Sequence, residues 1–272
     1  MYLCHKTIFR MKTNYQLRYA SNPVDAKNYD TKRLRNDFLI ERLFADDEVN
    51  MVYSMYDRMI VGGAMPKAEE LKLEAIPPLK ADYFTTRREI GVFNVGGSGY
   101  IMVGKEKFKL NFKEALYIGR GDREVVFGSD NAEEPARFYF NSTTAHKEYP
   151  CRVVTKKDAL VAHMGSLETS NERNINKMIV SQILPTCQLQ MGMTELMPGS
   201  VWNTMPAHVH SRRMEAYFYF EVPAGQAVCH LMGEPEETRH IWMKNNQAVL
   251  SPEWSIHSAA GTHNYTFIWG MG

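Results

Sequence analysis

The chain has 272 residues, of which 44% are hydrophobic and 23% are charged. This composition indicates a globular protein with a sizeable core and excludes a disordered, collagen-like or coiled-coil chain. The 32 basic and 31 acidic residues leave a formal charge of +1. No overall field therefore favours nucleic acid or an anionic membrane as a partner.

The sequence shows neither a recognisable targeting signal nor a close spacing of cysteines. The apolar runs are only a few residues long, and Met1 to Tyr19 lack the apolar core of a signal peptide. We therefore expect a cytoplasmic protein. The cysteines Cys4, Cys151, Cys187 and Cys229 are widely spaced, which predicts neither a disulfide framework nor a thiolate zinc site.

The chain opens with a polar arm and continues as β-structure. Residues 1–36 show little periodicity and are predicted to form an N-terminal arm, with a short amphipathic helix following over 37–44. Beyond the helix, short runs rich in Val, Ile, Tyr, Phe and Thr alternate with turn residues, which predicts an all-β protein of sandwich or barrel type. The predicted strands are Met51–Tyr53, Gly91–Val95, Tyr100–Val103, Ala115–Ile118, Glu124–Phe127, Ala136–Phe140, Cys187–Leu196, Ala216–Val222, Ala227–Met232, Gln247–Leu250 and Tyr265–Trp269.

The chain also divides into two similar halves. A break near Tyr149 and Pro150 separates a domain over 37–150 from a domain over 151–272. Two pairs of similar segments follow each other in the same order, namely 87–89 with 212–215 and 115–121 with 248–254. This order favours an internal duplication of one β-domain.

The chemistry-bearing segment lies in the second half. His208 and His210 are two residues apart, so in a strand they share a face and can bind one ion. Glu215 opens a strong strand and His257 follows a Pro turn, and both can return to the two imidazoles. A lone His-x-His is more often structural, but three His and one Glu suit Zn²⁺, Fe²⁺ or Mn²⁺.

The full pattern, His-x-His-x₄-Glu followed later by Pro-x₄-His, resembles the two motifs of the cupin superfamily. His208, His210, Glu215 and His257 fall on its four ligand positions. Residues 37–144 contain no histidine, so a metal-free first half is expected.

Longer segments carry a more specific resemblance. They include Arg33–Ile40, Asp57–Gly63, Asn203–Pro206, Pro235–Ile241 and Ser251–Ser258. From about Tyr29 to its end the chain is similar to the 5-dehydro-4-deoxy-D-glucuronate isomerase family, whose members act in pectin and uronate degradation. The resemblance implies a homohexameric bicupin with one Zn²⁺ on the four ligand positions. It also implies an aldose–ketose isomerisation of a small uronate, 5-dehydro-4-deoxy-D-glucuronate, to 3-deoxy-D-glycero-2,5-hexodiulosonate.

Such a reaction removes a proton next to a carbonyl group and stabilises an enediolate. Tyr217 and Tyr219 share the strand parity of Glu215, and Glu253 lies near His257, so these three are the candidate catalytic residues besides the ligands. The candidates for binding the carboxylate and hydroxyls of a uronate are Arg212, Arg213, Lys177, Gln188 and Gln190. Weaker candidates for the same role are Arg173, Arg239 and Thr194.

Each candidate also has a structural interpretation. Tyrosines commonly fill the interior of a β-barrel, and a charged turn residue is usually solvated. Two other functions stay open. Three His and one Glu suit a metal-dependent oxygenase, and a sugar-binding cupin with a structural metal would carry the same ligands. His146, His163, His230, His240 and His263 have no partner spacing and are interpreted as structural or surface residues.

Overall fold

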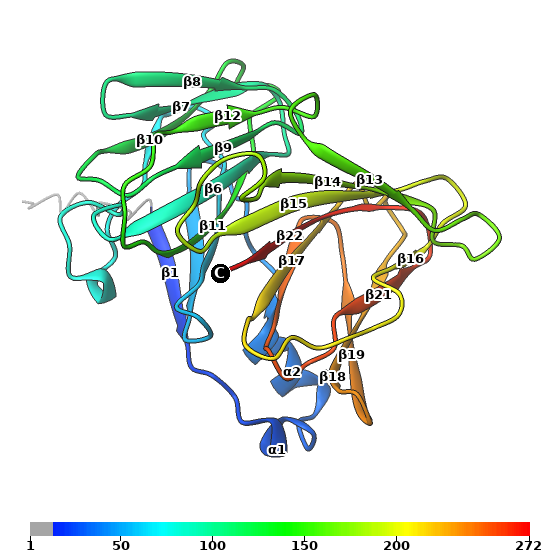
Figure 1. Cartoon of the computed structure of the whole chain (residues 1–272). Helices are drawn as coiled ribbons and strands as arrows, with labels where there is room; N and C mark the ends of the chain where they lie inside the picture. Colours follow the sequence, from blue (N-terminus) through cyan, green and yellow to red (C-terminus); the bar gives the residue numbers. More distant parts are fainter. Residues whose placement is uncertain (1–12) are drawn as a thin grey trace, which may run out of the picture.

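The computed structural model describes residues 13–272 and contains four β-sheets that form two similar halves (Figure 1). In the first half, a seven-stranded sheet of order β1-β3-β4-β11-β6-β9-β12 is joined by a four-stranded sheet of order β5-β10-β7-β8. The strands are β1 (Thr13–Arg18), β3 (Val49–Ser54), β4 (Ile60–Ala64), β5 (Leu71–Lys72), β6 (Arg88–Asn94), β7 (Gly99–Val103), β8 (Glu106–Leu110), β9 (Ala115–Ile118), β10 (Val125–Ser129), β11 (Phe138–Thr144) and β12 (Arg152–Val154).

The second half repeats this plan, with orders β13-β14-β15-β22-β17-β20-β2 and β16-β21-β18-β19. Its strands are β2 (Leu39–Ile40), β13 (Leu160–Met164), β14 (Arg173–Ile179), β15 (Gln190–Leu196), β16 (Trp202–Asn203), β17 (Glu215–Phe220), β18 (Val228–Glu234), β19 (Glu237–Met243), β20 (Gln247–Ser251), β21 (Ser258–Gly261) and β22 (Thr266–Met271). The helical segments are α1 (Pro23–Ala26), α2 (Thr31–Phe38) and the 3₁₀ turn η1 (Pro77–Leu79).

The strand orders match position by position between the halves. β6 and β17 are each fifth in their seven-stranded sheet, and β9 and β20 are each sixth. The similar segments found in the sequence lie at these strands, 87–89 and 212–215 at the starts of β6 and β17 and 115–121 and 248–254 on β9 and β20. The all-β fold with two related halves is therefore confirmed.

Two edge strands pair with the half on the far side of the predicted boundaries. Leu39 of β2 pairs with Val249 of β20, in the sheet of the second half. Arg152 of β12 pairs with Tyr117 of β9, in the sheet of the first half. The boundaries at 36/37 and 150/151 stay a prediction, and each half takes one edge strand from beyond them.

The helix predicted over 37–44 is wrong in its position. The helix is α2, where the Asp30 side chain caps the amide of Arg33 at 2.7 Å. The apolar residues that follow form β2 because its pairing with β20 buries both Leu39 and Ile40. The predicted arm is not free either, since β1 pairs in parallel with β3 along the sheet edge. Cys4 and Met11 lie outside the described residues.

The two seven-stranded sheets pack against each other at the centre of the molecule (Figure 1). The rings of Tyr139 and Phe218 stack across this junction with centroids 4.4 Å apart. Gly91 permits the close approach, because a Cβ there would lie 2.3 Å from the sulfur of Met191. A separate apolar core fills the interior of the first half.

Other sequence expectations concern membranes and thiols. No helix within residues 13–272 is long and apolar enough to cross a bilayer. The three described cysteines, Cys151, Cys187 and Cys229, are free thiols, as the spacing predicts.

Candidate metal centre

Four predicted ligands converge at one mouth of the second half. His208 and His210 lie in the loop before β17, Glu215 is the first residue of β17, and His257 directly precedes β21. The ligand nitrogens of the three histidines lie within 4.8 Å of one another. Glu215 Oε2 lies 3.1 Å from Nε2 of His210 and 3.1 Å from Nε2 of His257. Three imidazoles and a carboxylate oxygen therefore converge as the ligands of one ion would.

The backbone conformation that brings the histidines together differs from the predicted one. The histidine pair is not in a strand, since residues 204–214 form a loop. His208 is instead oriented by its Nδ1, which lies 3.3 Å from the carbonyl oxygen of Pro206 and leaves Nε2 for a metal. The structure brings the four predicted residues together, but strand parity was the wrong reason for their proximity.

The centre is buried on one side and open on the other. Glu215 and His257 are buried, whereas His210 is half-buried and His208 is exposed. Burial lowers the pKa of His257, although Glu215 opposes this effect. The neutral imidazole, which is the form that binds metal, is thereby favoured.

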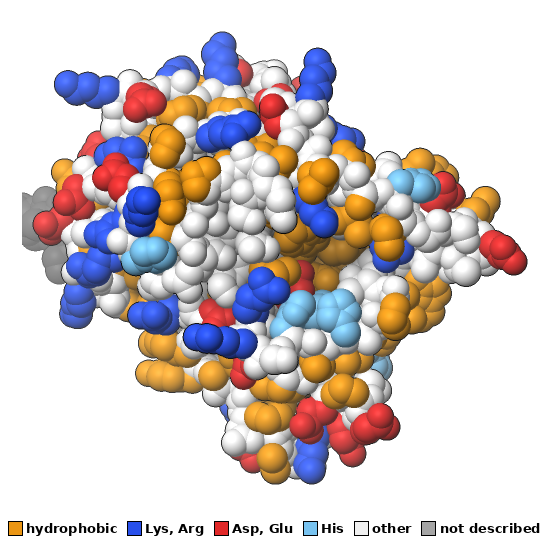
Figure 2. All heavy atoms as spheres, viewed as in Figure 1, with side chains coloured by type: hydrophobic (Ala, Val, Ile, Leu, Met, Phe, Trp, Pro, Cys, Tyr) orange, Lys and Arg blue, Asp and Glu red, His pale blue; other side chains and the backbone are white. Residues whose placement is uncertain are grey.

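A cavity of about 590 Å³ opens beside the ligands. Figure 2 shows histidine side chains gathered at the rim of a hollow on this face. Besides the ligands, the walls comprise Arg173, Ile175 and Lys177 of β14, Thr194 of β15, Tyr217 of β17, Phe267, Trp269 and Met271 of β22, and Thr204, Met205 and Pro206 of the loop. The lining combines an apolar wall with two cationic side chains.

The sequence comparisons decide the family. A family model described as the KduI/IolB family matches residues 38–272. The chain belongs to the KduI/IolB family.

Relatives in this family are close over almost the whole chain. A protein of Bacteroides fragilis named 4-deoxy-L-threo-5-hexosulose-uronate ketol-isomerase is 73% identical over 262 residues, covering 96% of this chain and 94% of its own. A protein of the same name from Formosa agariphila is 58% identical, covering 96% and 93%.

Two solved structures share the fold at low identity. An IolB-like protein of Salmonella typhimurium LT2 has a TM-score of 0.65 and 16% identity over 79% of this chain and 83% of its own. A Lactobacillus farciminis oxalate decarboxylase in a formate complex has a TM-score of 0.55 and 11% identity, covering 78% and 76%. They support the all-β cupin fold for this KduI/IolB chain.

The two predicted tyrosines occupy different environments. Tyr217 lines the cavity, and its hydroxyl lies 3.1 Å from Oγ1 of Thr204. Burial, and secondarily the charge of Glu215, raises the pKa of Tyr217 well above its usual value. Tyr217 therefore keeps its proton at neutral pH.

Tyr219 lies deeper and does not line the cavity. Its hydroxyl is 2.8 Å from Nδ1 of His230, which is fully buried. Burial lowers the pKa of His230 to about 3, so the imidazole is neutral and forms this hydrogen bond with the tyrosine hydroxyl. His230 is a structural residue, as the sequence interpretation has it.

The remaining predicted residues divide into one that lines the cavity and five that do not. Lys177 is in the lining. Arg212 and Arg213 are exposed in the loop, because the chain turns outward between the histidines and β17. Gln188 Nε2 donates to the carbonyl oxygen of Thr144 at 2.9 Å, on the first half. Gln190 and Glu253 also lie outside the lining.

Sequence reasoning missed part of the wall of this KduI/IolB cavity. Trp269 pairs with both Gly192 and Tyr217 in the sheet, and its ring covers Gly192. Arg173 and Thr194 were only secondary candidates. The missing information was the strand order, which places β15 between β14 and β22.

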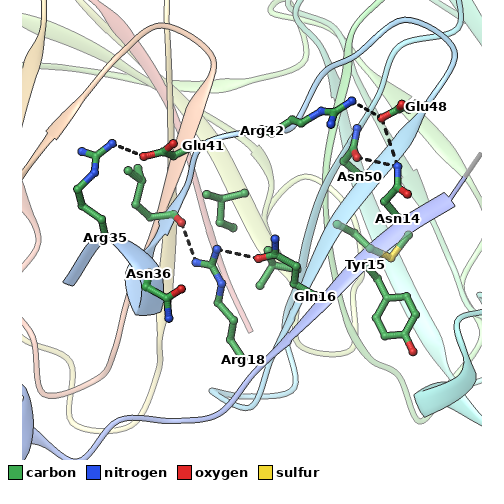
Figure 3. Close-up of a pocket in the computed structure, with 14 residues that line it drawn as sticks. Asn14, Tyr15, Gln16, Arg18, Arg35, Asn36, Glu41, Arg42, Glu48 and Asn50 are labelled. Atoms are coloured by element: carbon green, nitrogen blue, oxygen red, sulfur yellow. Dashed lines mark hydrogen bonds and ion pairs between the residues drawn. The ribbon is translucent and has the colours of Figure 1, made fainter. Parts of the chain in front are cut away.

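A larger hollow of about 820 Å³ lies between β1, α2 and β3. It is lined by arginines whose side chains bond to neighbouring residues within it (Figure 3). Arg35 pairs with Glu41, Arg42 Nη2 lies 2.7 Å from Glu48 Oε2, and Arg18 Nη1 donates to the carbonyl oxygen of Leu39 at 2.8 Å. The described residues that line the hollow include no histidine, and these contacts bind the arm to the body of the protein.

Proposed function

We propose that this chain is a 4-deoxy-L-threo-5-hexosulose-uronate ketol-isomerase that uses a zinc ion. The observation that carries the proposal is the set of three imidazoles and one carboxylate beside a cavity lined by Lys177 and Arg173. The names of relatives up to 73% identical support the same reaction. In that reaction 5-dehydro-4-deoxy-D-glucuronate becomes 3-deoxy-D-glycero-2,5-hexodiulosonate without net oxidation.

The residues present fit a zinc ion. His208, His210, Glu215 and His257 would hold it, and the exposed side of the centre leaves room for substrate. When bound, the ion supplies Lewis-acid polarisation of the carbonyl and hydroxyl oxygens of the substrate.

The cationic wall suits the carboxylate end of the substrate. The Lys177 side chain makes no hydrogen bond or ion pair with another residue in the described range, so its amine is available to a ligand. The order β14-β15-β22-β17 places it three strand spacings from Tyr217, or about 14 Å between backbones. A six-carbon acid together with the lysine side chain spans this distance, so one end of the substrate meets the ligands and the other meets β14.

The proton steps then fall to residues of the lining. Tyr217 keeps its proton and would donate a hydrogen bond to the oxygen on which charge develops. Glu215 is the carboxylate among the lining residues. Its Oε2 contacts the histidines, and we assign Oε1 the role of accepting the proton from carbon.

The test measures metal content and isomerase activity on 5-dehydro-4-deoxy-D-glucuronate in wild type, His210→Ala and His146→Ala. His146 is exposed and outside the cavity, so it serves as the matched control. We expect stoichiometric zinc and turnover in wild type and control, and loss of both in His210→Ala. Bound metal with no turnover would refute the assignment. Oxygen uptake with bound iron would support an oxygenase, and metal without any reaction a sugar-binding protein.

The assembly and the cellular location are further proposals. We infer a homohexamer, which the family resemblance implies, and we also infer a cytoplasmic location. Sedimentation or light scattering that yields a monomer mass would contradict the hexamer.

A further inference from the structure

The first half has its own pocket at the mouth that corresponds to the metal centre. In the second half the cavity lies where β17 begins and β22 ends, and in the first half a pocket of about 140 Å³ lies where β6 begins and β11 ends. These strands correspond in the two sheet orders. The first half has therefore kept a pocket at the duplicated position without the metal ligands.

The described residues that line this pocket contribute three guanidinium groups and no carboxylate. The arginines are Arg58, Arg87 and Arg88, and the neighbouring walls are largely apolar. Arg58 forms no hydrogen bond or ion pair through its side chain with another described residue. Arg87 donates to the backbone carbonyls of Leu79 and Lys80, which leaves its charge without a counter-charge.

Arg88 is the unusual member, because it is only 3% exposed. Its Nε lies 3.0 Å from Oγ of Ser142, and its Nη2 lies 2.7 Å from the carbonyl oxygen of Ser142. The guanidinium carbon lies 5.5 Å from the centroid of the Tyr53 ring. Nη2 also donates to the backbone carbonyl oxygen of Arg58 at 2.5 Å. These contacts engage Nε and Nη2 of Arg88, but no ion pair joins Arg88 to any carboxylate in residues 13–272.

A buried charge without a partner is costly, and proteins normally pair such charges. Burial lowers the pKa of Arg88 to about 10, and the nearby charge of Arg58 acts in the same direction. An anion bound between Arg58 and Arg88 would offset both the cost of the buried charge and the repulsion between the two guanidinium groups. Glu89, the next residue, cannot serve as the counter-charge of Arg88, because its side chain faces the other way. Its carboxylate accepts hydrogen bonds from the backbone amides of Cys187, Gln188 and Leu189.

We propose that the pocket formed by Arg58, Arg87 and Arg88 is a second ligand site that binds a compact oxyanion. The pocket holds the volume of about four or five water molecules, which fits phosphate or the carboxylate end of a two- or three-carbon acid and not a whole uronate. Guanidinium groups bind both oxyanions through charge-assisted hydrogen bonds. The site is distinct from the metal centre and does not depend on the proposed isomerase reaction.

The test is calorimetric titration of the full-length, zinc-loaded protein with inorganic phosphate and, separately, with glycolate. Whichever anion binds more tightly identifies the source of the oxyanion. We expect Arg58→Gln, a change at an exposed side chain, to weaken binding at least about fivefold. Lys105→Gln removes the same charge at an exposed turn away from the pocket and is the matched control, expected to bind as wild type.

His210→Ala separates this site from the metal centre. We expect it to bind the anion as wild type does, because His210 lies in the other half. Arg88→Lys is a second variant, which keeps the buried charge but loses the guanidinium geometry and should also weaken binding. The proposal is overturned if neither anion binds wild type, if Arg58→Gln binds like the control, or if binding disappears in His210→Ala.

Discussion

Asp57 Oδ2 accepts a 2.7 Å hydrogen bond from the backbone amide of Met214. Asp57 lies in the turn between β3 and β4 of the first half, and Met214 directly precedes the ligand Glu215. The turn has positive φ values of 48° at Asp57 and 52° at Arg58, as in a tight two-residue hairpin. The first half thus fixes the start of the strand that carries the candidate ligand Glu215.

This contact predicts a linked loss of stability and metal affinity. We expect Asp57→Ala to lower the free energy of unfolding by about 1 kcal/mol, because it removes a charge-assisted hydrogen bond from a partly exposed site. Zinc binding should weaken as well, since Glu215 loses its anchor. Urea unfolding and zinc titration measure the two effects. Asp122→Ala, at an exposed aspartate, is the control, and equal zinc affinity in both variants would contradict the link.

Metal removal should destabilise the wild type and leave His210→Ala unaffected. A ligand that binds only the folded state at 100 times its Kd adds about 2.7 kcal/mol of stability. A chelator should therefore lower the Tm of wild type to that of His210→Ala, and added zinc should restore it in wild type alone. Thermal unfolding with and without chelator checks this. Equal Tm values for wild type in both conditions would mean that the four residues do not bind the ion.

Tyr217→Phe tests the hydroxyl as a proton donor. The ring packs 4.9 Å from that of Phe267, so phenylalanine should keep the same position. We expect kcat to fall about 100-fold with zinc content unchanged. Tyr219→Phe, which alters a hydroxyl outside the cavity, should leave kcat within a few-fold of wild type. Similar kcat values for the two variants would show that the Tyr217 hydroxyl has no role in the reaction.

Lys177→Met tests the carboxylate site. Loss of one charge-assisted contact should reduce kcat/KM about 10- to 100-fold, with the larger part in KM. Lys177→Arg should recover part of the loss, because it restores the positive charge. Arg213→Gln removes a charge from the exposed loop and should behave as wild type. If steady-state kinetics show the larger defect in Arg213→Gln, the substrate carboxylate binds to the loop and not to Lys177.

The buried His230 predicts acid sensitivity of the fold. Its pKa is about 3 when folded, against about 6.5 when unfolded. Below pH 6.5 the unfolded chain binds a proton that the folded chain does not, so this contribution to stability is full above pH 6.5 and is lost as the pH falls towards 3.

The slope should be about 1.4 kcal/mol per pH unit in that window. His230→Asn keeps an acceptor for the Tyr219 hydroxyl but does not titrate there. Urea unfolding at several pH values should show the shallower dependence in His230→Asn, with both proteins free of metal. Parallel pH profiles would show that His230 is already protonated when folded.

The sequence determined the fold class and indicated the candidate metal ligands. Strand-forming runs report the all-β fold because side-chain alternation and turn residues are local properties. The identities of His208, His210, Glu215 and His257 followed from motif spacing, which the chain carries linearly. The sequence also predicted that Glu215 and Tyr217 lie on the same face of β17, because alternate residues of a strand share a face.

Only the tertiary structure decided which other side chains reach the cavity. Arg212 and Arg213 neighbour the ligands in sequence yet lie outside it, whereas Lys177 and Arg173 reach it through sheet pairings. The exchange of β2 and β12 between the halves likewise depends on pairing of residues that lie far apart in the chain. Such pairings are set by packing of the whole chain, and local sequence patterns do not encode them.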